Sequence, residues 1–86
     1  MQIRRHKSFE KDYRKLKPAQ RDRLKQAFKL FVDNPMHPDL YNHPLFGKWT
    51  GYHSISFGGD WRAHYRNIDE HTAYFVAVGT HSQLYK

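Results

Sequence analysis

Seven histidines are the first candidates for chemistry in this chain. They are His6, His37, His43, His53, His64, His71 and His81. A metal site needs ligands that converge at a fixed spacing, such as two histidines one turn apart on a helix. No two of these residues form such a pair in the sequence. The spacing therefore predicts neither a metal centre nor another cofactor.

A second kind of chemistry suits the same residue types and needs no metal. Cleavage of RNA through its own 2′-hydroxyl requires a base at that hydroxyl, an acid at the leaving 5′-oxygen and a cation at the phosphate. Histidine suits both proton transfers because its pKa lies near neutrality. Arginine suits the phosphate because its planar fork matches two oxygens. The candidates are His81, His43 and Arg62.

Each of these three residues also has a purely structural interpretation. His81 could bond a backbone carbonyl in a turn, and His43, which precedes a proline, could cap the segment around it. Arg62 could pair with a carboxylate across a sheet. Residue types alone leave these alternatives open.

The net charge of the chain limits the classes of partner that it could bind. Its 86 residues include 15 Lys and Arg against 8 Asp and Glu, for a formal net charge of +7. Such an excess indicates nucleic acid, an anionic membrane surface or an acidic protein as partner. Cysteine is absent, which excludes disulfides and thiolate metal sites. The N-terminal segment lacks a signal-peptide core and no apolar window is long enough to span a membrane, so we expect a cytoplasmic protein.

The elements that must position the candidates begin with a strand and two helices. The sequence of residues 2–6 predicts a short strand. Apolar residues at helical spacing predict one helix over residues 8–16, with Ser8 as its N-cap, and a second over residues 18–32. The apolar stripe of the second helix comprises Leu24, Ala27, Phe28, Phe31 and Val32.

From Gly51 onwards the sequence alternates with a period of two, which predicts strands. We expect strands over residues 52–57, 60–67 and 72–78, and a Gly58-Gly59 turn between the first two. The third is apolar on both faces and should be central. We expect Gly79 to end it and residues 80–86 to form a tail. The predicted fold class is α+β, a single domain over residues 1–86 with the order β-α-α-β-β-β, in which two helices cover one face of a mainly antiparallel sheet.

Alternation also assigns side chains to the two faces of this sheet. Trp61, Ala63 and Tyr65 should face the helices. Arg62, His64 and Arg66 should then occupy the uncovered face. A wet, cationic sheet face suits nucleic-acid binding.

Three segments of the chain resemble the YafQ branch of RelE-type bacterial toxins. They are HPLFGKWTGY (His43–Tyr52), GDWRAHY (Gly59–Tyr65) and GTHSQLY (Gly79–Tyr85). Their order and spacing, together with the predicted layout, extend the resemblance over nearly the whole chain. The resemblance implies a microbial-ribonuclease-like fold and the toxin of a type II toxin–antitoxin system, which cleaves mRNA in the ribosomal A site. The implied partners are mRNA, the ribosome and a cognate antitoxin that covers the toxin and often binds operator DNA. No membrane partner is expected.

The resemblance also implies roles for particular residues. His81 matches the family's principal catalytic histidine, and His43 matches a histidine of the connector. Asp60 and Trp61 match the family's Asp-Trp pair, and Tyr85 matches its C-terminal Phe. Arg62 stands where RelE itself carries an arginine that stabilises the phosphate. The residues expected to contact RNA are Trp61, Arg66, Tyr85 and Lys48.

The chain departs from the family pattern on one strand. The pattern places an Asp and a His on the uncovered face of the strand before the hairpin, where this chain has Ser54 and Ser56. Serine has no pKa useful for proton transfer at neutral pH. We expect His64, on the same face as Arg62, to take over the missing acid/base role.

Two functions of other classes compete with RNA cleavage. A ParE-like toxin of similar fold inhibits DNA gyrase by binding, and the ending around His81 counts against it. A domain of this fold could also bind RNA or protein without catalysis, and the two serines favour that alternative.

Overall fold

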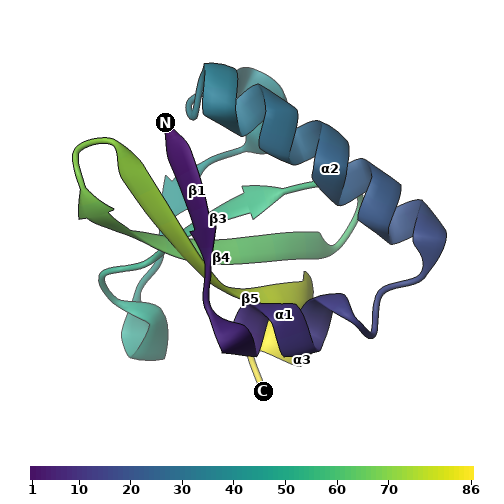
Figure 1. Cartoon of the computed structure of the whole chain (residues 1–86). Coiled ribbons are helices and arrows are strands. Elements are labelled where there is room, and N and C mark those ends of the chain that lie inside the picture. The colour runs from purple at the N-terminus through teal and green to yellow at the C-terminus, as the bar shows by residue number, and fades with distance from the viewer.

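The computed structural model describes all residues, 1–86, as one sheet with helices packed against it (Figure 1). Its strands are β1 (Gln2–Arg5), β2 (His43–Pro44), β3 (His53–Ser56), β4 (Trp61–Asp69) and β5 (Thr72–Thr80), and its helices are α1 (Lys7–Tyr13), α2 (Pro18–Asp33) and α3 (His81–Leu84). Two short 3₁₀ segments, η1 (Pro38–Leu40) and η2 (Gly47–Trp49), shape the connector between α2 and β3. The predicted α+β class and element order are confirmed, with β2 and α3 as additions.

The sheet has the strand order β1-β5-β4-β3-β2. The strand predicted to be central, β5, lies between β1 and β4 and is therefore internal, although β4 is the middle strand of the five. All neighbouring strands are antiparallel except β1 and β5, which pair in parallel from Gln2 opposite Thr72 to Arg5 opposite Phe75. The first and last strands of the chain are therefore direct neighbours.

Helices α1 and α2 cover one face of the sheet, as predicted. Phe9 of α1, Phe31 of α2 and Phe75 of β5 are completely buried in a shared core. Full burial of such a side chain stabilises the fold by roughly 1.5–3 kcal/mol. The helical stripe was wrong at one position, since Val32 is 49% exposed at the end of α2.

The start of α1 differs from the prediction. His6, not Ser8, caps the helix, and its Nδ1 atom accepts a hydrogen bond from the Ser8 backbone N–H at 3.0 Å. The Ser8 hydroxyl instead donates to the carbonyl of Val76 at 2.6 Å. This bond ties the first turn of α1 to β5.

The chain after Val78 was also predicted wrongly. β5 continues through Gly79 to Thr80, and α3 follows at once. Thr80 and Gln83 form a capping box in which each side chain bonds the backbone N–H of the other residue. A side chain at position 79 would meet Gln83, because a Cβ there would lie 2.8 Å from its Oε1 atom. Gly79 thus allows this close approach rather than ending the strand.

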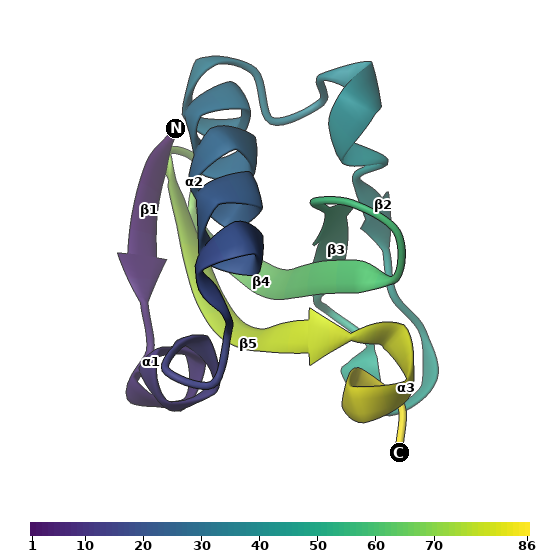
Figure 2. The ribbon, with the colours of Figure 1, turned by 90° about the vertical axis from the view of Figure 1, so that its right-hand side faces the viewer.

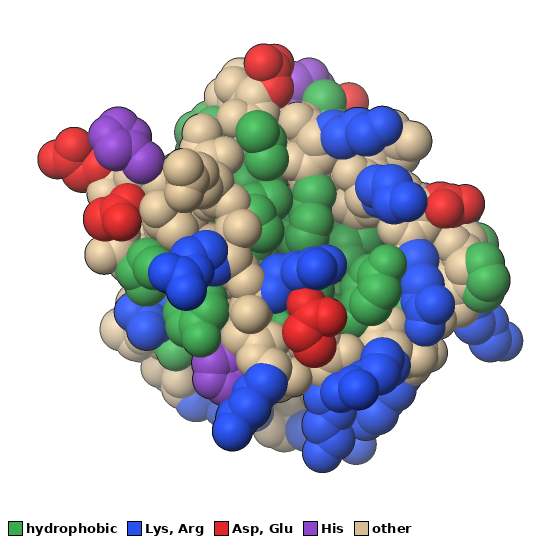
Figure 3. Space-filling model, viewed as in Figure 1, with side chains coloured by type: hydrophobic (Ala, Val, Ile, Leu, Met, Phe, Trp, Pro, Cys, Tyr) green, Lys and Arg blue, Asp and Glu red, His purple; other side chains and the backbone are tan.

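The excess of basic side chains is spread over the surface and does not form one compact patch. Figure 3 shows Lys and Arg side chains scattered over one face of the molecule, around an apolar strip, with acidic side chains at the rim and one in the centre. No helix combines the length and apolar character needed to cross a bilayer.

Candidate active site

The candidate residues gather on the face of the sheet opposite α1 and α2. Strand register places them in two rows: His43, Ser54 and His64 lie side by side across β2, β3 and β4, and Ser56 lies beside Arg62 in the next row. Helix α3 closes one side of this area. Figure 2 shows it directly after β5, next to the connector from β2 to β3.

The first residue of α3 is His81, which is exposed. Its backbone N–H donates to the Asp60 carbonyl at 2.8 Å, so the β3–β4 turn holds the start of the helix. The His81 ring lies 4.4 Å from the Tyr85 ring, centroid to centroid. Burial raises the pKa of Tyr85, and the charge of Arg62 opposes that rise. Neither ring nitrogen of His81 makes a hydrogen bond or an ion pair with the protein, so both can reach a bound substrate.

Arg62 is anchored through one end of its guanidinium. Its Nη1 atom donates to the Gly59 carbonyl at 2.6 Å and to the Ser56 hydroxyl at 3.1 Å. No carboxylate pairs with it, which removes the ion-pair alternative left open by the sequence. Its other N–H donors remain available, so Arg62 presents an oriented cationic edge that fits a phosphate.

His43 is exposed on β2, and its tautomer follows from one contact. Its Nδ1 atom lies 2.7 Å from the Tyr41 carbonyl. A carbonyl only accepts hydrogen bonds, so Nδ1 carries the hydrogen. In the neutral ring, Nε2 then holds a free lone pair. His43 is thus prepared to accept a proton.

His64 is the largest departure from the expected site. The prediction placed it on a wet face, yet it is 0% exposed, under Trp49 at a 4.5 Å ring separation and Tyr85 at 5.5 Å. Neither ring nitrogen has a hydrogen-bond partner. Burial, followed by the nearby His43, His81 and Arg62, lowers the pKa of His64 to about 4. At neutral pH it is an uncharged, covered ring, which contradicts its expected role as an accessible acid/base group.

This burial predicts a stability that depends on pH. The His64 pKa falls from 6.5 in the unfolded chain to about 4 in the folded protein, so the unfolded state binds a proton more readily in that range. The stability that depends on a neutral His64 is fully present above pH 6.5 and is lost as the pH falls towards 4. The expected loss is roughly 3 kcal/mol, since each pKa unit corresponds to about 1.4 kcal/mol.

Urea unfolding at a series of pH values would measure this effect. His64→Phe keeps an aromatic ring in place without a titratable group, so its unfolding free energy should vary much less over the same pH range. His71→Ala, in the exposed β4–β5 turn, is the matched control and should behave like wild type. An identical pH dependence in wild type and His64→Phe would show that another group is responsible.

The two serines take different positions. Ser54 is buried beside His64, and its hydroxyl has no hydrogen-bond partner. Ser56 accepts a hydrogen bond from Arg62. Ser54 therefore lies beneath the site, whereas Ser56 supports the phosphate-binding candidate.

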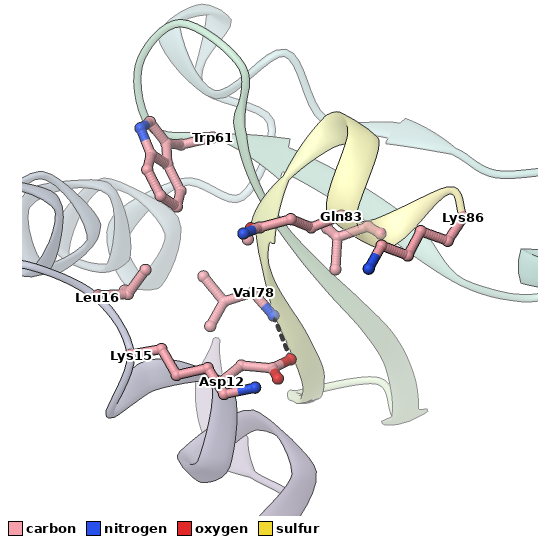
Figure 4. Close-up of a pocket in the computed structure, with 9 residues that line it drawn as sticks. Asp12, Lys15, Leu16, Trp61, Val78, Gln83 and Lys86 are labelled. Carbon is pink, nitrogen blue, oxygen red and sulfur yellow. Dashed lines mark hydrogen bonds between the residues drawn. The ribbon is translucent and has the colours of Figure 1, made fainter.

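Three of the residues predicted to contact RNA lie away from His81 or already bond another part of the protein. Trp61 lies on the helical side of the sheet, where it lines a cavity of about 270 Å³ with Leu16 and Val78 (Figure 4). Lys48 is exposed and donates through Nζ to a main-chain oxygen of Lys86 at 2.7 Å, so one of its N–H donors is already engaged. Arg66 is on the expected face but further along β4, over the ring of Tyr74. Tyr85 is the one that lies beside His81.

Asp60 contributes through its backbone. Its carbonyl accepts a hydrogen bond from the His81 backbone N–H, while its carboxylate is exposed and makes no hydrogen bond or ion pair with the protein.

No three His, Asp or Glu side chains lie close enough together to hold a metal ion.

Two elements of the site were missed by reasoning from the sequence. Trp49 covers His64 and donates through Nε1 to the Leu84 carbonyl at 3.1 Å, which joins the connector to α3. No local pattern indicates that contact. Helix α3 itself had a signal, because Thr80-His81-Ser82-Gln83 matches the capping-box pattern of Ser or Thr followed three residues later by Glu or Gln.

Comparison with solved structures identifies the fold. YafQ from Escherichia coli BL21(DE3) superposes with a TM-score of 0.77 and 26% identity, covering 98% of this chain and 97% of that one. YafQ in the E. coli DinJ–YafQ toxin–antitoxin complex gives 0.74 and 28%, with 98% and 96% covered. The YoeB/ParE toxin from Agrobacterium tumefaciens shares the fold, with a TM-score of 0.75, 18% identity and 94% and 99% covered. No curated protein sequence matches the chain.

Fold and site together define a small toxin with the architecture shared by the YafQ and YoeB types. The sequence pattern of the family described as "Bacterial toxin of type II toxin-antitoxin system, YafQ" matches residues 1–86. This chain belongs to the YafQ family of type II toxins.

Proposed function

We propose that this toxin is a ribosome-dependent endoribonuclease that cleaves mRNA in the A site by metal-independent acid/base chemistry and so stops translation. The observation that carries the proposal is the arrangement around Arg62. An oriented guanidinium without a carboxylate partner lies in the same small area as two exposed histidines, one of which has a free lone pair. Those are the groups that cleavage through a 2′-hydroxyl requires.

In this mechanism His43 acts as the general base and His81 acts as the general acid. His43 Nε2 takes the proton of the 2′-hydroxyl as the 2′-oxygen attacks the adjacent phosphorus. His81 gives a proton to the 5′-oxygen as the P–O5′ bond breaks, which leaves a 2′,3′-cyclic phosphate and a 5′-hydroxyl. Arg62 stabilises the charge on the phosphate oxygens in flight, the kind of electrostatic contribution that is usually largest. Tyr85 supports the His81 ring and offers a face on which a base can stack.

The covered His64 contributes to this mechanism in its neutral form. A protonated ring there would add a third positive charge under two catalytic histidines and Arg62. Its low pKa keeps that charge absent at neutral pH. His64 is therefore a positioning residue that packs beneath the catalytic groups.

The ribosome supplies what the site lacks. Ser54 and Ser56 provide no proton-transfer group, and the catalytic side chains lie on an open surface rather than in a deep cleft. Orientation of the substrate alone is worth several kcal/mol in favourable cases. An action on ribosomes places the toxin in the cytoplasm, and a cognate antitoxin, like DinJ in its complex with YafQ, would bind it until release.

A non-catalytic RNA-binding domain is the second candidate function. The two serines and the covered His64 favour it, because the site has fewer accessible acid/base groups than the family resemblance implies.

Induced expression in a bacterial host distinguishes these functions. Growth and mRNA 5′-ends would be followed together, and plasmid supercoiling would be measured in the same cultures. Growth arrest with new 5′-ends inside reading frames is the expected result. Arrest with altered supercoiling and no new ends would indicate a gyrase inhibitor, and growth without arrest would favour the binding domain.

A further inference from the structure

We infer that Arg4 and Arg66 form a second phosphate subsite, which holds the RNA strand on the sheet beyond the bond to be cleaved. This inference rests on the proposed function and names part of how the substrate is bound. Its location is the end of the uncovered sheet face where β1, β5 and β4 lie side by side.

Strand register places three side chains of this area in one row. Arg4 of β1 is directly opposite Tyr74 of β5, and Tyr74 is directly opposite Arg66 of β4. A bulge in β5 after Phe75 keeps Tyr74 on the same face as Ala77, which is opposite His64. The row therefore continues the face that carries Arg62.

The guanidinium of Arg66 is held in position by the neighbouring ring. It lies over Tyr74 at 5.4 Å from the ring centroid, and His6 contacts the same ring edge-on at 5.5 Å. Such a cation–π contact orients an arginine without using its N–H donors. The fork of Arg66 is thus free to bind phosphate oxygens.

Neither arginine has an anionic partner in the protein. Both are exposed, and neither makes a hydrogen bond or an ion pair, although Arg5 next to Arg4 in the chain pairs with Glu10 at 2.8 Å. Asp69, opposite Thr72 on β5, accepts a hydrogen bond from the His71 backbone N–H at 2.8 Å. Two arginines without acidic partners thus flank Tyr74 in the strand register, where a bound anion would be attracted to both.

The spacing fits one continuous strand of nucleic acid. Arg62 and Arg66 are four residues apart on β4, which corresponds to about 13 Å at the usual rise of a strand. A backbone that places one phosphate at Arg62 would bring a flanking phosphate to Arg66 and Arg4. RNA is favoured over a protein partner because both cations lack a carboxylate partner and lie on the sheet face that carries Arg62.

Salt-dependent binding of single-stranded RNA tests the subsite. The full chain with His81→Ala, which leaves the RNA intact, would be titrated against fluorescent RNA at several salt concentrations. Each phosphate contact adds about −0.7 to the slope of log affinity against log salt for a single strand. Adding Arg4→Ala and Arg66→Ala should weaken binding and make the slope shallower by about 0.7, because the two arginines share one phosphate.

Matched variants separate the local effect from loss of charge. Lys25→Ala with Lys29→Ala removes the same charge from exposed positions on α2 and should leave the slope unchanged. Tyr74→Phe keeps the ring and should bind like the parent, whereas Tyr74→Leu should lose part of the effect. RNA too short to reach from Arg62 to Arg66 should not distinguish the arginine variant from its parent.

The possible failures are distinguishable. An unchanged slope in the arginine variant, with normal RNA binding by the parent, would overturn the subsite and leave the nuclease proposal intact. Absence of salt-dependent RNA binding by the parent itself would count against both. A defect confined to ribosome binding, or to binding of an acidic antitoxin, would assign the row to that partner instead and would also overturn the inference.

Discussion

Replacing His81 by alanine should lower the rate of mRNA cleavage by roughly 10²–10⁴-fold, the usual contribution of a positioned general acid or base. The ring has no hydrogen bond to the protein and lies at the surface, so its loss should leave the fold intact. Single-turnover cleavage on purified ribosome–mRNA complexes would measure the rate, and circular dichroism would check the fold. His71→Ala is the matched control, with wild-type activity expected.

A modified substrate tests the particular role given to His81. RNA with sulfur in place of the bridging 5′-oxygen has a leaving group that departs without protonation. His81→Ala should recover most of its lost rate on that substrate. His43→Ala should stay slow, because removal of the 2′-proton is still required. Equal recovery in both variants, or in neither, would contradict the assignment of His81 as the acid and His43 as the base.

Replacing Arg62 by alanine should lower the rate by roughly 10²–10³-fold, as loss of one oriented donor at a developing charge does in other enzymes. Arg62→Lys keeps the charge but not the planar fork, so it should restore only part of the rate. The same single-turnover assay would measure both variants. Arg14→Ala removes an exposed positive charge elsewhere and should have no comparable effect.

Two controls guard the interpretation of the Arg62 variants. Arg62 also bonds the Gly59 carbonyl, so thermal unfolding would show whether the β3–β4 turn has loosened. Ser56→Ala removes one anchor of the guanidinium while the arginine remains, and a smaller loss of rate is expected. If Arg62→Ala cleaved at the wild-type rate in a stable protein, phosphate stabilisation would have to come from elsewhere.

Much of the fold follows from local patterns in the sequence. Helical spacing located α1 and α2, and alternation located β3, β4 and β5, because each element buries one face and exposes the other. The parallel pairing of β1 with β5 could not be read in this way, since it joins residues at opposite ends of the chain. Helix α3 was missed although its capping box is visible in the sequence.

The site shows where alternation stops being informative. It assigned Arg62, His64 and Arg66 correctly to one face of β4 and Trp61 to the other. It could not tell that the connector and α3 fold over the middle of that face, since burial of His64 depends on Trp49 and Tyr85, which are distant in sequence. Strand position predicts direction, whereas exposure depends on tertiary packing.

The pairing of β1 with β5 has a consequence for the cell that makes this toxin. Strand β5 needs Gln2 to Arg5 on one edge and β4 on the other, and α3, which carries His81, begins only after β5 ends. Pairings between segments so far apart in sequence form late, after the cost of closing a long loop has been met. A nascent chain still lacking its last strand holds neither a complete sheet nor His81. Each molecule would therefore become toxic only once residues 2–81 have all been synthesised and have folded together.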